Sequence, residues 1–108
     1  MGTLHYDGDS YDLDDRTLFH LQLAISTKLR RGENFFLTWP VPVEQGSGRH
    51  CVWIDNGVPI HIYYSGSRQI TVNREWVEAL IGSAAHGGGM YIGSEADMTS
   101  QATRDARS

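Results

Sequence analysis

The segment DRTLFHLQLAISTKLRR, residues 15–31, decides most of the fold, because it is the strongest helical segment of the chain. Large aliphatic residues recur along it with the period of an α-helix and lie on one face. The residues of this stripe are Leu18, Leu21, Ile25 and Leu29. Asp14 precedes the segment as a favourable N-cap, and Gly32 follows it as a residue suited to the position after the last turn. We therefore predict a helix that buries one stripe.

The sequence before this helix predicts a β-hairpin. Residues 4–6 read as a short strand, DGDS (7–10) has the composition of a turn, and residues 11–13 return. Residues 5–8 also match the Lys-x-Asp-Gly motif of ATP-dependent DNA ligases at the Asp and Gly positions. However, His5 occupies the position of the lysine that becomes adenylated in those enzymes. Residues 1–15 hold five Asp and no Lys or Arg, and the negative electrostatic potential of these carboxylates repels a triphosphate. We therefore interpret the stretch as a turn.

Three segments after the helix are rich in aromatic and β-branched residues and predict strands: ENFFLTW (33–39), RHCVWI (49–54) and VPIHIYY (58–64). The Asn-Gly pair in DNG (55–57) is typical of a tight hairpin turn between the second strand and the third. We expect the three strands to form an antiparallel meander.

A second helix is predicted over residues 74–86, with Asn73 as its N-cap and a run of three glycines, Gly87 to Gly89, at its end. The segment MYIG (90–93) predicts a short last strand. The order hairpin, helix, meander, helix and short strand favours an α+β fold. In this fold a small antiparallel sheet carries both helices on one face.

The chain has 108 residues, of which 40% are hydrophobic, and this suffices for one compact domain. We assign residues 1–93 to that domain and predict a disordered tail over residues 94–108, which are polar, small and without period. The single cysteine, Cys51, excludes a disulfide within the chain and fits a reducing compartment. No apolar run approaches the ~20 residues of a membrane span, and the acidic N-terminus lacks the layout of a secretory signal. We expect a cytoplasmic protein without a membrane partner.

The formal net charge of −4 is unevenly distributed along the chain. Residues 1–15 carry −5, from five Asp and no Lys or Arg, whereas residues 16–50 carry +3, from five Lys and Arg against two Glu. Four of these cations lie near aromatic residues in the sequence: Lys28, Arg30, Arg31 and Arg49. Cations interleaved with exposed rings suit single-stranded nucleic acid, because the cations neutralise phosphates and the rings stack on bases. Alternatively, the cations complement the dipole of the helix C-terminus and the rings belong to the core.

Residue types that carry catalysis or bind metals form no recognised pattern. The histidines and Cys51 show no Cys-x-x-Cys or His-x-x-x-His spacing, so we predict no metal site. Cys51 lies within an apolar strand and is interpreted as an inert, buried thiol. The glycines of AAHGGGM (84–90) end a helix and do not follow a strand, as a dinucleotide-binding loop requires. We therefore predict no enzyme activity and no cofactor, and we identify no small-molecule substrate.

The sequence has more apolar surface than its two helices can cover. Phe19 and Leu23 form a second apolar pair, on a different face of the first helix from its buried stripe. Both faces of the predicted sheet carry large apolar side chains, but two helices of ~10 Å diameter cover only one face. Apolar patches left in this way usually mark an interface. We therefore expect a homo-oligomer or a protein partner, with an interface formed by Phe19, Leu23, Phe36 and Trp53.

Four segments together resemble a family of short actinobacterial proteins that phages also encode: MGTLHYDG (1–8), DDRTLFHLQLAISTKLRRGENFFLTW (14–39), GRHCVWI (48–54) and GSRQITVNREWVEAL (66–80). The resemblance covers residues 1–93. This family has no established function, and its members are often labelled ATP-dependent DNA ligase by automatic transfer. The resemblance implies a fold and a lineage and supplies no catalytic residues.

These observations lead us to interpret the chain as a small non-catalytic binding or adaptor module that self-associates through apolar surface. The alternative is an accessory protein that contacts nucleic acid through the basic cluster at the end of the first helix. A relation to ATP-dependent DNA ligases, as the family label implies, is the least favoured interpretation, because the motif lysine is absent.

Overall fold

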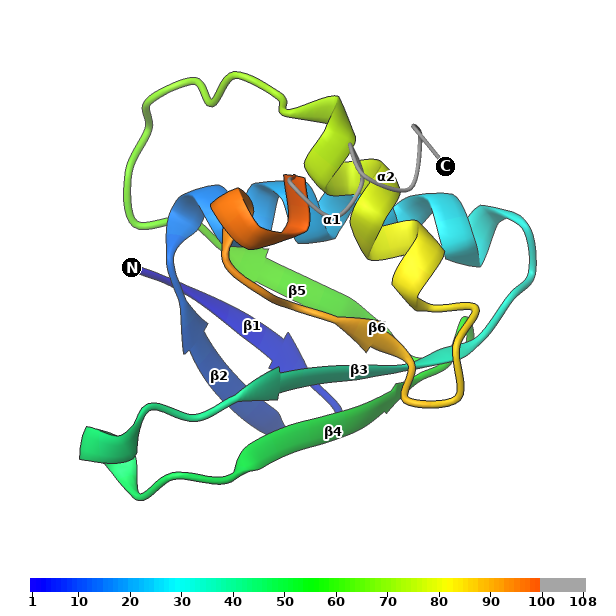
Figure 1. Cartoon of the computed structure of the whole chain (residues 1–108), viewed down its shortest axis with the longest axis horizontal. Coiled ribbons are helices and arrows are strands. Elements are labelled where there is room, and N and C mark those ends of the chain that lie inside the picture. The colour runs from blue at the N-terminus through cyan, green and yellow to red at the C-terminus, as the bar shows by residue number, and fades with distance from the viewer. Residues whose placement is uncertain (100–108) are drawn as a thin grey trace.

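Helices α1 and α2 lie on one side of the molecule over two small β-sheets, in a computed structural model that describes residues 1–99 (Figure 1). One sheet has the strand order β2-β1-β5, and the other has the order β4-β3-β6. In chain order the elements are β1 (Gly2–Tyr6), β2 (Asp9–Leu13), α1 (Asp15–Arg30), β3 (Phe35–Pro40), the 3₁₀-helix η1 (Val43–Gln45), β4 (Arg49–Ile54), β5 (Ile60–Tyr63), α2 (Arg74–Ser83) and β6 (Met90–Tyr91). The predicted α+β fold class is confirmed.

Helix α1 begins and ends at the residues that its sequence indicates. The carboxylate of Asp14 accepts a hydrogen bond from the Thr17 N–H at 3.0 Å, as an N-cap does. At the other end Gly32 has a φ of 74°, and the N–H groups of Gly32 and Glu33 donate to carbonyls of the last turn at 3.0 and 3.1 Å. These two bonds form a Schellman motif, which satisfies carbonyl groups that a helix end leaves unpaired.

The stretch that resembles the ligase motif forms the turn of the β1–β2 hairpin. Tyr6 pairs with Asp9, so the loop between the strands has only Asp7 and Gly8. Their φ angles are 51° and 87°, and a type I′ turn requires positive φ at both positions. The interpretation of this stretch as a hairpin turn is confirmed.

The arrangement of the strands differs from the predicted meander and corrects it. Strands β3 and β4 pair antiparallel, but β5 leaves β4 and pairs antiparallel with β1 in the other sheet. A turn follows β4, with the Val58 N–H donating to the Asp55 carbonyl at 3.1 Å, but neither Asn56 nor Gly57 has the positive φ of the expected hairpin turn. In addition, the Asp55 N–H donates to the Tyr6 hydroxyl at 2.8 Å, and Pro59 has no N–H for a ladder with β4. The last strand, β6, pairs parallel with β3.

The core lies between the helices and the inner faces of the two sheets. Helix α1 buries the predicted stripe at Leu18, Leu21 and Ile25, together with Ala24 and His20. The strands contribute alternate residues, among them Leu4, Tyr6, Phe35, Leu37 and Trp39. Helix α2 adds Trp76 and Leu80, and its N-cap is Asn73, as predicted. None of the helices within residues 1–99 has the length and apolar character to cross a membrane.

The first residues of the predicted disordered tail belong to the folded structure and correct the boundary at residue 93. Residues 95–99 are helical, and Met98 is buried in the core. Glu95 accepts hydrogen bonds from the guanidinium of Arg16 at 2.8 and 2.7 Å, and the Asn73 side chain donates to the same carboxylate at 2.9 Å. The rest of the predicted tail, residues 100–108, lies outside the described residues.

Candidate functional site

The β4-β3-β6 sheet has one buried face and one open face. Along β3 the residues Phe35, Leu37 and Trp39 point into the core, since successive side chains alternate across a strand. The alternate positions of the three strands carry large aromatic side chains on the open face. These are 44% exposed for Phe36, 48% for Trp53 and 47% for Tyr91, so about half of each ring surface contacts water.

The strand register brings these residues together. Phe36 pairs with Trp53, and their ring centroids lie 4.9 Å apart with an interplanar angle of 67°. Thr38 pairs with Cys51 on one side and Tyr91 on the other, and it is buried between them. Its hydroxyl donates to the His50 carbonyl at 2.8 Å, so it is not available as a polar group on the surface. We name this set of five residues the aromatic face.

A close contact between backbones holds β6 against β3. Gly89 has a φ of 86°, and a Cβ atom at this position would lie 2.5 Å from the Phe36 carbonyl oxygen. Only glycine fits both the backbone conformation and the space. Gly89 therefore positions Tyr91 at the edge of the aromatic face.

The two ends of β4 carry opposite charges. Arg49 begins the strand, and Asp55 follows it immediately. By alternation from Trp53, Arg49 belongs to the side of the strand that forms the aromatic face, and Asp55 lies in the turn at the other end of the strand. One carboxylate oxygen of Asp55 accepts from the Gly57 N–H at 2.8 Å, which fixes the orientation of this side chain.

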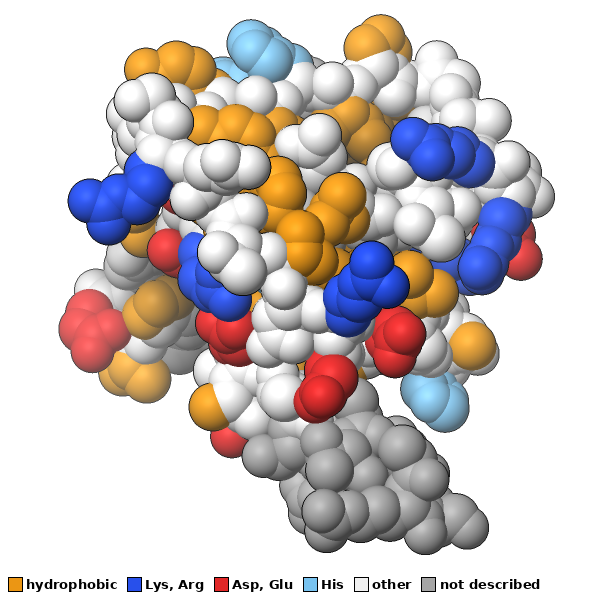
Figure 2. Space-filling view, turned by 90° about the horizontal axis from the view of Figure 1, so that it is seen from above, with side chains coloured by type: hydrophobic (Ala, Val, Ile, Leu, Met, Phe, Trp, Pro, Cys, Tyr) orange, Lys and Arg blue, Asp and Glu red, His pale blue; other side chains and the backbone are white. Residues whose placement is uncertain are grey.

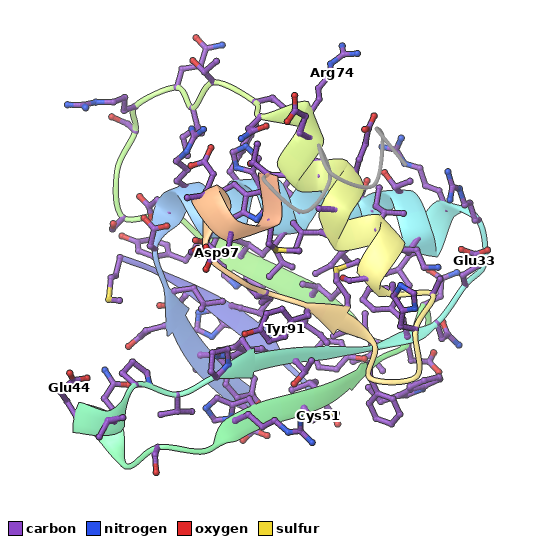
Figure 3. All side chains as sticks on the ribbon, viewed as in Figure 1. Glu33, Glu44, Cys51, Arg74, Tyr91 and Asp97 are labelled. Carbon is purple, nitrogen blue, oxygen red and sulfur yellow. The ribbon has the colours of Figure 1, made fainter. Side chains whose placement is uncertain are left out.

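The only cysteine lies on the aromatic face, and this corrects its interpretation as a buried thiol. Cys51 is exposed, although its neighbours Val52 and Ile54 face inward. Figure 3 shows Cys51 on β4, on the side of the molecule away from α1 and α2. The alternation of a strand predicts that Cys51 and Val52 point to opposite faces, but it does not say which face is covered.

The structure separates the four predicted interface residues into two pairs. Phe36 and Trp53 are in contact on the aromatic face, whereas Phe19 and Leu23 lie on α1 and are partly buried. Figure 2 looks onto the helical side of the molecule, where hydrophobic side chains gather near the centre with charged side chains around them. Tyr91 could not be predicted as part of this surface, because β6 has only two residues and is too short to show a period.

The predicted basic cluster is also divided. The Nζ atom of Lys28 forms an ion pair with Glu33 at 2.8 Å, and only 13% of the Lys28 side chain is exposed. Arg30 and Arg31 are exposed at the end of α1. Arg49 pairs with Pro40, at the opposite end of the β3–β4 hairpin from the chain that leaves α1. Figure 3 shows these two ends, which are marked by Glu33 and Glu44.

Polar groups gather on the outer face of the other sheet. His5 Nδ1 lies 2.9 Å from the Ser10 hydroxyl, and the His5 ring stacks on His61 with centroids 5.1 Å apart. The Thr3 hydroxyl donates to Asp12 at 3.0 Å beside them. Among residues 1–99, no three His, Cys, Asp or Glu side chains come close enough together to hold a metal ion.

The fold and this surface define a small α+β protein with an open aromatic sheet face. The chain belongs to the family described as Domain of unknown function (DUF7882), whose family model matches residues 1–95. The match reaches Glu95, so it includes all the strands named above and the ion pair with Arg16. Searches of the curated proteins and of the solved structures found no match. The expectation of a family without an assigned function is confirmed.

Proposed function

We propose that this protein is a non-catalytic binding module that self-associates through the aromatic face. The observation that carries the proposal is the contact between Phe36 and Trp53, two half-exposed rings on a sheet face away from the helices. Large apolar residues grouped on one flat surface usually mark an interface. The family match identifies no catalytic activity.

The charges at the ends of β4 favour a second copy of the chain as the occupant. In a symmetric dimer each residue of one copy meets the two-fold image of another residue. If two β4 strands cross antiparallel about an axis at Val52, midway between Cys51 and Trp53, Arg49 of one copy lies opposite Asp55 of the other. The same face is then complementary to itself in charge, which favours a second copy over a different partner.

The area of the face indicates weak association. A large aromatic side chain buries about 150–250 Å² when fully covered, so three half-exposed rings offer roughly 300 Å² on each copy. The pair would bury roughly 600 Å² from these rings, which is below the ~1,200 Å² of a stable interface. We therefore expect a dimer whose population depends strongly on protein concentration.

Contact with nucleic acid is the second candidate function, because exposed rings beside cations also stack bases. Arg49 lies at one end of the aromatic face, and Arg30 and Arg31 are exposed at the end of α1. The engagement of Lys28 by Glu33 leaves fewer cations for phosphates. Binding of this kind falls steeply with added salt, whereas apolar self-association does not.

Alkylation of Cys51 tests the choice between these functions. Under the proposal, iodoacetamide reacts with Cys51 more slowly at high protein concentration than at low concentration, because the second copy covers the thiol. The Trp53→Asp variant should lose this concentration dependence. A rate that is independent of concentration in the unmodified chain, together with protection of Cys51 by a single-stranded oligonucleotide at low salt, would favour the nucleic-acid function instead.

A further inference from the structure

A cavity of about 560 Å³ opens between β2 and the β3–β4 hairpin. Three rings line it and contact one another: Tyr11, Trp39 and His50. The centroid of Tyr11 lies 5.2 Å from that of Trp39 and 5.1 Å from that of His50, and the Trp39 and His50 centroids lie 5.0 Å apart. The cavity is separate from the aromatic face, since neither Phe36 nor Trp53 lines it.

The charged side chains that line this cavity are all acidic. They are Asp9, Asp12 and Asp14, but the Asp12 carboxylate bonds to Thr3 and the Asp14 carboxylate caps α1, so Asp9 is the acid on the same side of β2 as Tyr11. No Lys or Arg is among the described residues that line the cavity. The N-terminal ammonium of Met1, which also lines it, donates to the Ser65 hydroxyl at 3.1 Å. The cavity therefore has a negative field that repels phosphates and attracts cations.

Asp9 and Tyr11 bring a carboxylate and a ring to the same side of β2. They are two residues apart on the strand, so their side chains share a face. Burial raises the pKa of Tyr11 most. The carboxylate of Asp9 raises it further, both by electrostatic repulsion and by a hydrogen bond to Tyr11. The carboxylate thus acts directly on the ring that lines the cavity.

We propose that this cavity binds a small organic cation, of the alkylated ammonium class. The faces of Tyr and Trp rings carry negative electrostatic potential and attract such cations, whose methyl groups also contact the rings. The Asp9 carboxylate, on the same side of β2 as Tyr11, supplies the opposite charge. A bare metal ion fits less well, because the described residues offer no group of three His, Cys, Asp or Glu ligands. This ligand site is independent of the proposed self-association.

A titration with choline tests the proposal on the ¹⁵N-labelled full chain at constant ionic strength. The control ligand is 3,3-dimethyl-1-butanol, which has nearly the shape of choline and no charge. The chain has three tryptophans, each in a different environment, so the indole N–H signals report location. Choline should shift the Trp39 signal saturably and leave those of Trp53 and Trp76 in place, and the neutral alcohol should shift none of them. Equal shifts with both ligands, or no shift of Trp39 with choline, would overturn the proposal.

Two carboxylate variants test the origin of the affinity. Asp9→Asn removes the charge beside Tyr11 and should weaken choline binding at least five-fold. Asp97→Asn removes an exposed charge that does not line the cavity, and should leave choline binding unchanged. Because Asp9 is exposed, its amide variant is expected to fold, and unchanged indole signals in the absence of ligand will verify this. Unchanged affinity in Asp9→Asn, or an equal loss in both variants, would contradict the assignment.

Discussion

His20 of α1 accepts a hydrogen bond from the backbone N–H of Asn73, the N-cap of α2, at 2.9 Å through its Nε2 atom. Its Nδ1 atom lies 2.8 Å from the Arg16 carbonyl oxygen, so the ring must carry its proton on Nδ1. The imidazole is fully buried and stacks on Trp76, with centroids 4.5 Å apart. One neutral histidine therefore fixes where the second helix begins relative to the first.

Replacement of His20 should be strongly destabilising. His20→Leu leaves the Asn73 N–H without its acceptor in a buried position and removes the stacking on Trp76. We expect a loss of about 2–4 kcal/mol in the free energy of unfolding, measured by urea titration. His61→Leu is the matched control, because His61 is exposed, and it should change stability by less than about 0.5 kcal/mol. Equal effects of the two variants would contradict the role of His20.

Acid should loosen the segment at residues 94–99. Hydrogen bonds from Arg16, and then from Asn73, lower the pKa of Glu95 from 4.5 to about 2. A carboxyl whose pKa is lower in the folded state adds stability above its unfolded pKa, and this stability is lost as the pH falls from 4.5 toward 2. Because about a third of each partner is exposed, we expect the ion pair to contribute only about 1 kcal/mol.

Comparison with Glu95→Gln isolates this contribution. The pKa values of Asp15 and Glu33 are also lowered, by hydrogen bonds to Gly66 and to Lys28 respectively, so the whole protein loses stability in acid. The stability difference between the unmodified chain and Glu95→Gln should be present at neutral pH and shrink as the pH approaches 2. A difference that stays constant across this range would show that the ion pair does not respond to pH in this way.

Replacement by alanine should change the stability of the protein differently at two adjacent glycines, Gly88 and Gly89. Gly89→Ala introduces a Cβ atom 2.5 Å from the Phe36 carbonyl oxygen at a φ of 86°, and should cost more than about 1 kcal/mol. Gly88→Ala meets no atom within 4 Å and should change stability little. Because the clash displaces β6, Gly89→Ala should also weaken self-association, as measured by light scattering. Equal stability of the two variants would contradict the close contact between β6 and β3.

The sequence predicted those features that depend on neighbouring residues. These features are the helix caps Asp14 and Asn73, the glycine after α1 and the Asp7-Gly8 turn. Each depends on local backbone chemistry and was found where it was expected. The partner of β5 could not be predicted in this way. Asn56 and Gly57 do not adopt the positive φ of a hairpin turn, and the Asp55 N–H bonds to the hydroxyl of the distant Tyr6, in the strand with which β5 pairs.

The residues of the candidate site could likewise be predicted only where their positions depend on the local sequence. The sequence placed Phe36 and Trp53 among the expected interface residues, and their rings are in contact in the structure. Periodicity does not tell which face of a sheet the helices cover, so Cys51 was placed on the wrong side. Tyr91 joins the aromatic face through a parallel pairing with Thr38, a residue more than 50 positions earlier in the chain.

Sedimentation velocity over a range of protein concentrations tests the central claim most directly. The unmodified chain should sediment faster as its concentration rises, with little change on added salt, and Trp53→Asp should remain monomeric throughout. Tyr63→Asp is the matched control, because Tyr63 is a 57% exposed aromatic residue on the other sheet, and it should behave like the unmodified chain. A monomer at every concentration, or equal loss of association in both variants, would contradict self-association through the aromatic face.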